Sequence, residues 1–227
     1  MKPQATRPVV AITGCNRGLG FDLARVFDKA GYGLILHSRE AGALTPLLER
    51  ISVPCWSFHG DVQERNTLEA FSNLFSTVNG TILINNAALH CPGKQLNEFE
   101  DDEIARIMGV NLIAAMQLTA RALKANPHSP KTIVNINSMV GLEPKLKRSV
   151  YGASKTGLKA FSDSLRLEIA SSGSRVVSVF LSRVRTLPEF TEGMRPERVA
   201  QRILGWLELE SGDELILDGR ADKSLEQ

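Results

Sequence analysis

Tyr151 and Lys155 have the spacing with the clearest chemical meaning in this chain. On a helix, side chains four residues apart lie on one face, about one turn from each other. A phenol has a pKa of about 10 and is a poor acid–base group at neutral pH. An ammonium about 4 Å away, at an effective dielectric constant near 20, contributes on the order of 4 kcal/mol. We therefore expect Lys155 to lower the pKa of Tyr151 toward the range in which general acid–base catalysis is efficient.

A tyrosine and a lysine at this spacing also occur by chance at the start of an amphipathic helix, so the pair alone is weak evidence. Ser138 strengthens it, because this residue follows an apolar run that is typical of a strand. Its hydroxyl is expected at the carboxyl end of that strand, and ligands of open parallel sheets bind beyond those ends. Together, the three side chains predict an acid–base site at one edge of a sheet.

A glycine-rich segment near the N-terminus, Thr13-Gly14-Cys15-Asn16-Arg17-Gly18-Leu19-Gly20, lies between an apolar run and a helical pattern. Glycines permit a sharp strand-to-helix turn and a close approach of the backbone to a pyrophosphate. The helix that follows presents free N–H groups to the phosphates. A purely structural turn could use the same glycines, but the flanking strand and helix favour a dinucleotide site.

Short apolar runs alternate with helix-length amphipathic runs along the whole chain. Strands are expected at 9–13, 33–37, 54–58, 81–85, 132–137, 175–180 and 214–217. Helices are expected at 18–30, 64–77, 101–125, 151–172 and 196–209, with a weaker one at 41–50 that Pro46 interrupts. This alternation predicts an α/β fold, a doubly wound parallel sheet (Rossmann fold) of about seven strands with helices on both faces. No linker divides the pattern, so residues 1–227 are predicted to form one domain.

Composition excludes several functional classes. The net charge of +2 is too small to indicate nucleic acid or a membrane surface as partner. No window approaches the roughly 18 uninterrupted apolar residues of a spanning helix. The three cysteines are widely spaced, which indicates free thiols and a cytoplasmic protein. No metal site is expected, and each histidine is predicted to be structural, since none shares ligand spacing with another: His37, His59, His90 and His128.

At this point the chain resembles the short-chain dehydrogenase/reductase family, in which a Thr precedes the glycine spacing Gly-x-x-x-Gly-x-Gly. Asp61-Val62 is similar to the family's acidic cap for the adenine, and Asn85-Asn86-Ala87-Ala88 is similar to its Asn-Asn-Ala-Gly element. The similarity continues through the residues that match the family's catalytic group, which are Asn111, Ser138, Tyr151 and Lys155. The cofactor-binding residues implied are Gly14, Asn16, Arg17, Leu19, Gly20, Ser38, Arg39, Asp61, Val62, Asn86, Ala87, Tyr151, Lys155, Val184 and Thr186.

The resemblance implies an oxidoreductase that moves a hydride between a nicotinamide and a carbonyl or secondary alcohol. Tyr151 would protonate the carbonyl oxygen, and Ser138 would hold that oxygen. Lys155 would bind the ribose, and Asn111 would anchor a water that resupplies the proton. The resemblance also implies a homodimer or homotetramer assembled through the two long helices, 101–125 and 151–172.

The second strand predicts which nicotinamide is used. NAD-binding units place an Asp or Glu about 20 residues after the glycine turn, to bind the ribose 2′-hydroxyl. Here the strand ends in His37-Ser38-Arg39, and Arg17 adds a second guanidinium inside the turn. Two guanidiniums can clamp a 2′-phosphate through charge-assisted bonds. Each could be a solvated surface residue, but together they favour NADP(H) over an NAD-linked alcohol dehydrogenase.

The sixth strand departs from the family pattern. The family's Pro-Gly-x-Val-x-Thr is replaced by Leu181-Ser182-Arg183-Val184-Arg185-Thr186, and Ala88 replaces a glycine. The loss of Pro-Gly keeps a second hypothesis open, a non-catalytic NADP-binding or sensing protein on the same fold. The segment 187–195 is short for a loop that covers a substrate.

Cations flank the predicted site in the sequence. Lys145, Lys147 and Arg148 precede Tyr151, and Arg183 and Arg185 follow the sixth strand. If these side chains line the mouth of the site, the substrate is predicted to be anionic or attached to an acidic carrier. The alternative is an ordinary solvated loop.

Overall fold

The computed structural model describes residues 8–91, 93–186 and 191–226. Within these ranges, seven strands form one all-parallel sheet in the order β3-β2-β1-β4-β5-β6-β7. The strands are β1 (Val9–Ile12), β2 (Gly33–Ser38), β3 (Cys55–His59), β4 (Ile82–Asn85), β5 (Thr132–Ser138), β6 (Arg175–Leu181) and β7 (Glu214–Leu217). This arrangement confirms the predicted doubly wound α/β fold.

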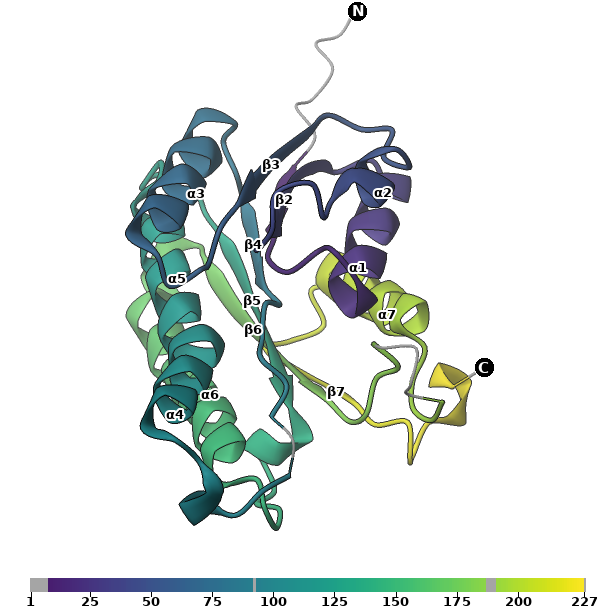
Figure 1. The fold of residues 1–227 in the computed structure, drawn as a ribbon. Helices are drawn as coiled ribbons and strands as arrows, with labels where there is room; N and C mark the ends of the chain where they lie inside the picture. Colours follow the sequence, from purple (N-terminus) through teal and green to yellow (C-terminus); the bar gives the residue numbers. More distant parts are fainter. Residues whose placement is uncertain (1–7, 92, 187–190, 227) are drawn as a thin grey trace, which may run out of the picture.

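Helices cover both faces of the sheet (Figure 1). One face carries α1 (Gly18–Lys29), α2 (Thr45–Leu48) and α7 (Pro196–Glu208), and the other carries α3 (Arg65–Thr77), α4 (Asp101–Met108), α5 (Ala114–Lys124) and α6 (Ser149–Glu168).

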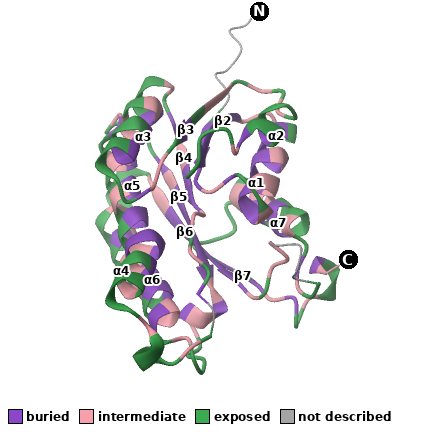
Figure 2. Ribbon diagram, viewed as in Figure 1, coloured by how far each residue is buried: buried purple, intermediate pink, exposed green. Residues whose placement is uncertain are grey.

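The pleat of the central strand divides the core between these two layers. Val10 and Ile12 of β1 pack in the cluster that contains α1 and α7 residues. Val9 and Ala11, which point the other way, pack in the cluster that contains α3 and α5 residues. Figure 2 shows the strands buried between helices whose outer surfaces are exposed. Burial on both faces explains why the strand sequences are continuous apolar runs.

The long helix predicted over 101–125 is interrupted by a π-helical turn, Gly109–Ile113, between α4 and α5. The π turn holds Asn111, one of the predicted catalytic residues, and turns of this kind often occur at functional sites. The weaker helix predicted over 41–50 is reduced to the four residues of α2, in which Pro46 occupies the first turn, where its missing N–H is not needed.

The sheet places its ligand-binding edge between β1 and β4, where the order of strands along the chain reverses. Thr13 follows β1, and its Oγ1 accepts hydrogen bonds from the backbone N–H groups of Asn86 (3.0 Å) and Ala87 (2.9 Å), which follow β4. The Asn86 side chain donates back to the carbonyl oxygens of Thr13 (2.8 Å) and Gly14 (3.2 Å). The glycine turn and the segment after β4 are therefore locked together at this edge.

Candidate active site

Two adjoining cavities lie beyond the carboxyl ends of the strands. The first, of about 540 Å³, is the dinucleotide cavity, lined by the glycine turn and the segments after β2, β3 and β4. The second, of about 830 Å³, is the reaction cavity, lined by the ends of β5 and β6 and the start of α6. Six residues line both: Leu19, Asn86, Ala88, His90, Tyr151 and Thr186. The two cavities therefore adjoin at these residues, Tyr151 among them.

Most of the predicted site residues lie on this pair of cavities. The dinucleotide cavity contains Gly14, Asn16, Arg17, Leu19, Gly20, Arg39, Asp61, Val62, Asn86, Ala87, Tyr151 and Thr186. The reaction cavity contains Ser138, Tyr151, Lys155, Val184 and Thr186. Ser38 and Asn111 are buried and line neither cavity.

Ser138, Tyr151 and Lys155 meet in the reaction cavity. Ser138 is the last residue of β5, and its Oγ accepts a hydrogen bond from the Val140 N–H at 3.3 Å, which holds the hydroxyl at the strand end. Tyr151 and Lys155 lie in the first two turns of α6. The Ser138 hydroxyl also interacts with the phenol, so the end of β5 faces the start of α6 across the cavity. The predicted juxtaposition of hydroxyl, phenol and ammonium is thus present.

The electrostatics of this cluster differ from the sequence-based expectation. Burial raises the pKa of Tyr151, and the hydrogen bond from Ser138 and the charge of Arg148 offset only part of that effect. Lys155 Nζ lies 5.9 Å from the centre of the phenol ring and donates to the Ile136 carbonyl oxygen at 3.0 Å. Burial lowers the pKa of Lys155 to about 8. In this arrangement the ammonium is desolvated and directed at a backbone carbonyl, so it does not lower the pKa of the phenol as expected.

Asn111 is held in the π turn by a closed set of hydrogen bonds. Its Oδ1 accepts from the Leu89 N–H at 2.7 Å, and its Nδ2 donates to the Leu89 carbonyl oxygen at 3.2 Å and to Ser154 Oγ at 3.3 Å. The Asn111 side chain therefore connects the segment after β4, at Leu89, to α6, at Ser154. Its role as the anchor of a water stays a prediction.

The glycine turn has backbone geometry that larger residues would disturb. Gly14 has a φ of +72°, in the left-handed region, and a Cβ there would lie 3.1 Å from Ala87 Cα. A Cβ on Gly20, in the first turn of α1, would overlap the carbonyl oxygen of Gly14. Only glycine allows the turn to pass this closely to the segment after β4.

The cationic end of the dinucleotide cavity contains the two predicted guanidiniums. Arg17 and Arg39 are both exposed and both line the cavity. Arg39 also forms an ion pair with Glu40 at 3.0 Å. Glu40 and Arg106 line the same cavity, and the sequence analysis assigned neither, because no motif marks them. Ser38 is turned inward, where its hydroxyl donates to the Glu40 carbonyl oxygen at 2.8 Å, so the structure does not place it on the cavity.

Ser182, one of the two residues that replace the family's Pro-Gly, contacts the C-terminal segment. Ser182 Oγ accepts a hydrogen bond from the Gly219 N–H at 3.0 Å, and its hydroxyl helps to lower the pKa of the Asp218 carboxyl. Gly219, Arg220 and Glu226 consequently line the reaction cavity, although nothing in their sequence context suggested it. Residues 187–190 of the short covering segment lie outside the described residues.

Of the cations predicted to flank the site, Lys145, Arg148 and Arg183 line the reaction cavity, whereas Lys147 and Arg185 do not. Arg148 Nη1 donates to the Cys91 carbonyl oxygen, which fixes the guanidinium beside the segment after β4. Arg183 forms an ion pair with Glu192 at 3.4 Å, and Arg185 donates to the Glu226 carbonyl oxygen at 2.6 Å. Three of the five cations predicted to flank the site therefore line the cavity, and Arg183 is neutralised there by Glu192.

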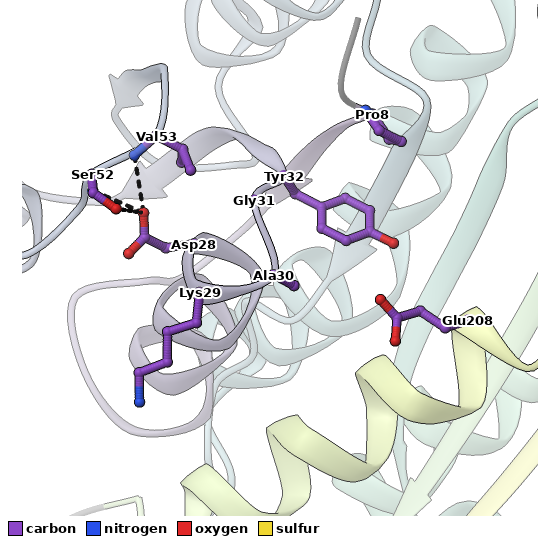
Figure 3. Close-up of a pocket in the computed structure, with 9 residues that line it drawn as sticks. All are labelled: Pro8, Asp28, Lys29, Ala30, Gly31, Tyr32, Ser52, Val53 and Glu208. Atoms are coloured by element: carbon purple, nitrogen blue, oxygen red, sulfur yellow. Dashed lines mark hydrogen bonds between the residues drawn. The ribbon is translucent and has the colours of Figure 1, made fainter. Parts of the chain in front are cut away.

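A further cavity, of about 650 Å³, lies at the amino ends of the strands, between α1, α7 and the start of β3 (Figure 3). Asp28 is its most buried charged residue, and Asp28 Oδ1 accepts three hydrogen bonds, from Ser52 N–H (2.8 Å), Ser52 Oγ (3.0 Å) and Val53 N–H (3.0 Å). This carboxylate fixes the loop that enters β3, and none of the predicted site residues lines the cavity.

Two further kinds of feature are absent from the described ranges. Those ranges contain no group of three or more His, Cys, Asp or Glu side chains arranged to hold a metal ion. They also contain no helix that combines the length and the apolar character needed to cross a membrane.

Comparison with known proteins relates this geometry to characterised relatives. A sequence model described as short chain dehydrogenase matches residues 8–193. Carbonyl reductase family member 4 of Xenopus laevis is 29% identical over 235 residues, which cover 93% of this chain and 96% of that protein. The NADPH-dependent 1-acyldihydroxyacetone phosphate reductase of Schizosaccharomyces pombe is 28% identical over 198 residues, which cover 83% of this chain and only 66% of that protein.

Solved structures give the same relationship. The short-chain dehydrogenase from Sphingobium yanoikuyae, solved in complex with NADPH, superposes with a TM-score of 0.81 at 26% sequence identity. The superposition covers 96% of this chain and 92% of that structure. The superposed part of the chain is therefore longer than the segment 8–193 that the sequence model matches.

Proposed function

The chain belongs to the short-chain dehydrogenase/reductase family of oxidoreductases, and we propose that it is an NADP(H)-dependent reductase of carbonyl groups. The same site would oxidise secondary alcohols in the reverse direction. One observation carries the proposal. Ser138, Tyr151 and Lys155 converge on a cavity that adjoins the one lined by the glycine turn and shares six lining residues with it. An acid–base group and a dinucleotide cradle are thus adjacent, with residues 1–227 acting as one catalytic unit.

The dinucleotide cavity fits the chemistry of a nicotinamide dinucleotide. Gly14 and Gly20 leave room that a Cβ would fill, and the start of α1 provides N–H groups for a pyrophosphate. Asp61 and Val62 would take the adenine end, while Val184 and Thr186 would take the nicotinamide end. The bound nicotinamide supplies a hydride to carbon. The remaining cofactor contacts would come from Asn16, Leu19, Asn86 and Ala87.

The chain's own residues supply the proton and stabilise charge on the substrate oxygen. Burial raises the pKa of Tyr151, so the phenol is protonated at neutral pH and suited to donate its proton to a carbonyl oxygen. The Ser138 hydroxyl, held by Val140, would donate a hydrogen bond to the same oxygen as negative charge develops there. Lys155 would bind the ribose, and Asn111 would keep the segment after β4 in place and anchor the water that returns a proton to Tyr151.

NADP(H) is preferred in this proposal over NAD(H). Arg17 and Arg39 lie on the same cavity as Asp61, and both are exposed enough to reach a 2′-phosphate. The ion pair between Arg39 and Glu40 restrains the guanidinium without burying it. The relative in Schizosaccharomyces pombe is named as NADPH-dependent, which supports the same preference.

We further propose that the substrate is anionic or attached to an acidic carrier. Lys145, Arg148 and Arg183 line the reaction cavity together with Arg220. Arg183 is paired with Glu192, which also lines the cavity, Arg220 with Asp218, and Glu226 with Lys223, so Lys145 and Arg148 supply the remaining positive charge. The positive charge of these two side chains would attract a carboxylate or phosphate.

We also propose that the protein is cytoplasmic and assembles as a homodimer or homotetramer. Apolar side chains are exposed on the long helices, with Ile113 at 48%, Met116 at 40% and Leu167 at 81% of their surface accessible. Burial of such side chains against a second copy would be favourable.

The experiment that tests this function has two stages. First, NADPH and NADH are titrated into the purified protein and binding is followed by nicotinamide fluorescence. Second, a panel of ketones that carry a carboxylate, a phosphate or no charge is supplied with NADPH, and loss of the reduced nicotinamide's absorbance is recorded. We expect the purified protein to bind NADPH tightly and to reduce the ketones that carry a carboxylate or a phosphate. Failure to bind either nucleotide would overturn it, and NADPH binding without turnover of any ketone would favour a sensing protein.

A further inference from the structure

His37, which the sequence analysis treated as merely structural, connects two walls of the dinucleotide cavity. The residue lies near the end of β2 and is only 3% exposed. Its Nδ1 lies 3.2 Å from the Gly14 N–H, and its Nε2 lies 2.9 Å from the Gly60 carbonyl oxygen. An imidazole of one residue therefore contacts both the glycine turn after β1 and the loop after β3.

The partners of His37 fix its protonation state. The Gly14 N–H can only donate, so Nδ1 accepts, and the Gly60 carbonyl can only accept, so Nε2 carries the hydrogen. Neutral imidazole with its proton on Nε2 satisfies both bonds, whereas a protonated ring would oppose an N–H to the Gly14 N–H. Burial lowers the pKa of His37; Asp61 and His59, the nearby titratable groups, act in opposite directions, Asp61 raising it and His59 lowering it.

The two segments that His37 connects are those that would contact opposite parts of the cofactor. Gly14 begins the turn that approaches the pyrophosphate, and Gly60 directly precedes Asp61 and Val62 at the adenine end. His37 and Gly60 line the same cavity. The imidazole also packs against the Phe58 ring in a tilted arrangement with ring centres 4.8 Å apart, so its position is set by packing as well as by hydrogen bonds.

We propose that His37 is a positioning residue for the dinucleotide, which sets the separation between the glycine turn and the Asp61 loop before the cofactor binds. This inference rests on the proposed function, because it concerns affinity for the same cofactor. It goes beyond that function by assigning a binding determinant to a side chain outside the glycine motif and outside the predicted phosphate clamp. If the two loops are already held at the right distance, cofactor binding does not have to order them, and its free energy is more favourable by that entropic cost.

The test compares three substitutions at this position. His37→Phe and His37→Leu remove both hydrogen bonds while filling the site with an aromatic or an aliphatic side chain. His37→Asn keeps an acceptor that can face the Gly14 N–H. Two lost hydrogen bonds predict a Kd for NADPH raised about tenfold or more in the Phe and Leu variants, with a smaller increase for Asn. With NADPH saturating, kcat and the KM for ketone are expected to stay close to wild type.

A matched control separates positioning from general loss of stability. Val177 is buried in β6, and Val177→Ala should lower Tm without touching either loop. All titrations are made at a temperature where circular dichroism shows each variant folded. An unchanged Kd in whichever of the Phe and Leu variants folds would overturn the inference, as would an equal Kd increase in Val177→Ala. A wild-type protein that bound no nucleotide would instead overturn the proposed function, and this inference with it.

Discussion

The Ser138 hydroxyl lies between a backbone N–H and the Tyr151 phenol: it accepts a hydrogen bond from the Val140 N–H and its side chain interacts with the phenol, so the end of β5 and the start of α6 face each other before any substrate binds. A carbonyl oxygen entering the reaction cavity would meet a hydroxyl and a phenol that are already aligned. Preorganised donors of this kind contribute to catalysis because they need not reorient as charge develops.

Replacement of Ser138 should therefore affect chemistry more than binding. We expect Ser138→Ala to lower kcat for ketone reduction by about 10²- to 10³-fold, the range typical for loss of one donor to a developing oxyanion. The Kd for NADPH should change little. Steady-state kinetics and nucleotide titration check the two expectations, and a kcat within threefold of wild type would show that Ser138 does not hold the reacting oxygen.

Lys155 gives a pH-dependent stability that can be measured without cofactor. Its pKa in the folded protein is about 8, below the usual value of 10.5, because burial disfavours the charged form. The unfolded state therefore binds more protons between these two values, and stability rises with pH across that interval. Relative to Lys155→Met, the wild-type free energy of unfolding should increase by about 2 to 3 kcal/mol between about pH 7 and pH 10. Urea unfolding at both pH values checks this, and a constant difference between the two proteins would contradict it.

The two guanidiniums of the dinucleotide cavity predict the nucleotide preference. Arg39→Ala should weaken NADPH binding by about tenfold to a hundredfold, as expected for the loss of charge-assisted hydrogen bonds, while NADH affinity stays the same. Arg17→Ala should act in the same direction. Fluorescence titration with both nucleotides measures the ratio of affinities. If Arg39→Ala kept the wild-type ratio of NADPH to NADH affinity, Arg39 would not be a ligand of the 2′-phosphate.

The charge of the reaction cavity can be tested with a pair of lysines from one loop. Lys145 lines the cavity and Lys147 does not, although both lie in the same loop. Lys145→Glu should raise KM for a ketone that bears a carboxylate, such as 4-acetylbenzoate, by about tenfold, with little effect on the neutral 4-acetylbenzamide. Lys147→Glu is the control and should leave both KM values near wild type. Equal effects of the two substitutions would indicate general surface attraction and not a contact in the cavity.

Much of this architecture could be predicted from the sequence because its signals are local. The apolar runs of β1 to β7 and the helical patterns between them predict the sheet and its two helical layers, and the glycine turn and the Tyr151–Lys155 pair predict which edge holds the site. The helix predicted over 101–125 was right in extent, but the sequence has no local signal for the π turn, whose Asn111 makes hydrogen bonds to the distant residues Leu89 and Ser154.

The remaining features depend on contacts between distant segments. His37 is significant only because Gly14 and Gly60 approach it from two other loops. Arg220 reaches the reaction cavity because Ser182 holds the turn at Gly219. The expected effect of Lys155 on Tyr151 was wrong for a similar reason: helical spacing gives the face on which a side chain lies, but the Ile136 carbonyl and the depth of burial determine where the ammonium points and how it titrates.

Tyr151→Phe tests the central claim most directly, because it removes one hydroxyl and keeps the ring that lines both cavities. The variant and the wild type are supplied with NADPH and a ketone that the wild type reduces, and the loss of reduced nicotinamide is followed by absorbance, with the Kd for NADPH measured in parallel. The account predicts a kcat lower by at least about 10²-fold, the contribution expected of a general acid, with the Kd unchanged. Reduction by Tyr151→Phe at the wild-type rate would contradict it.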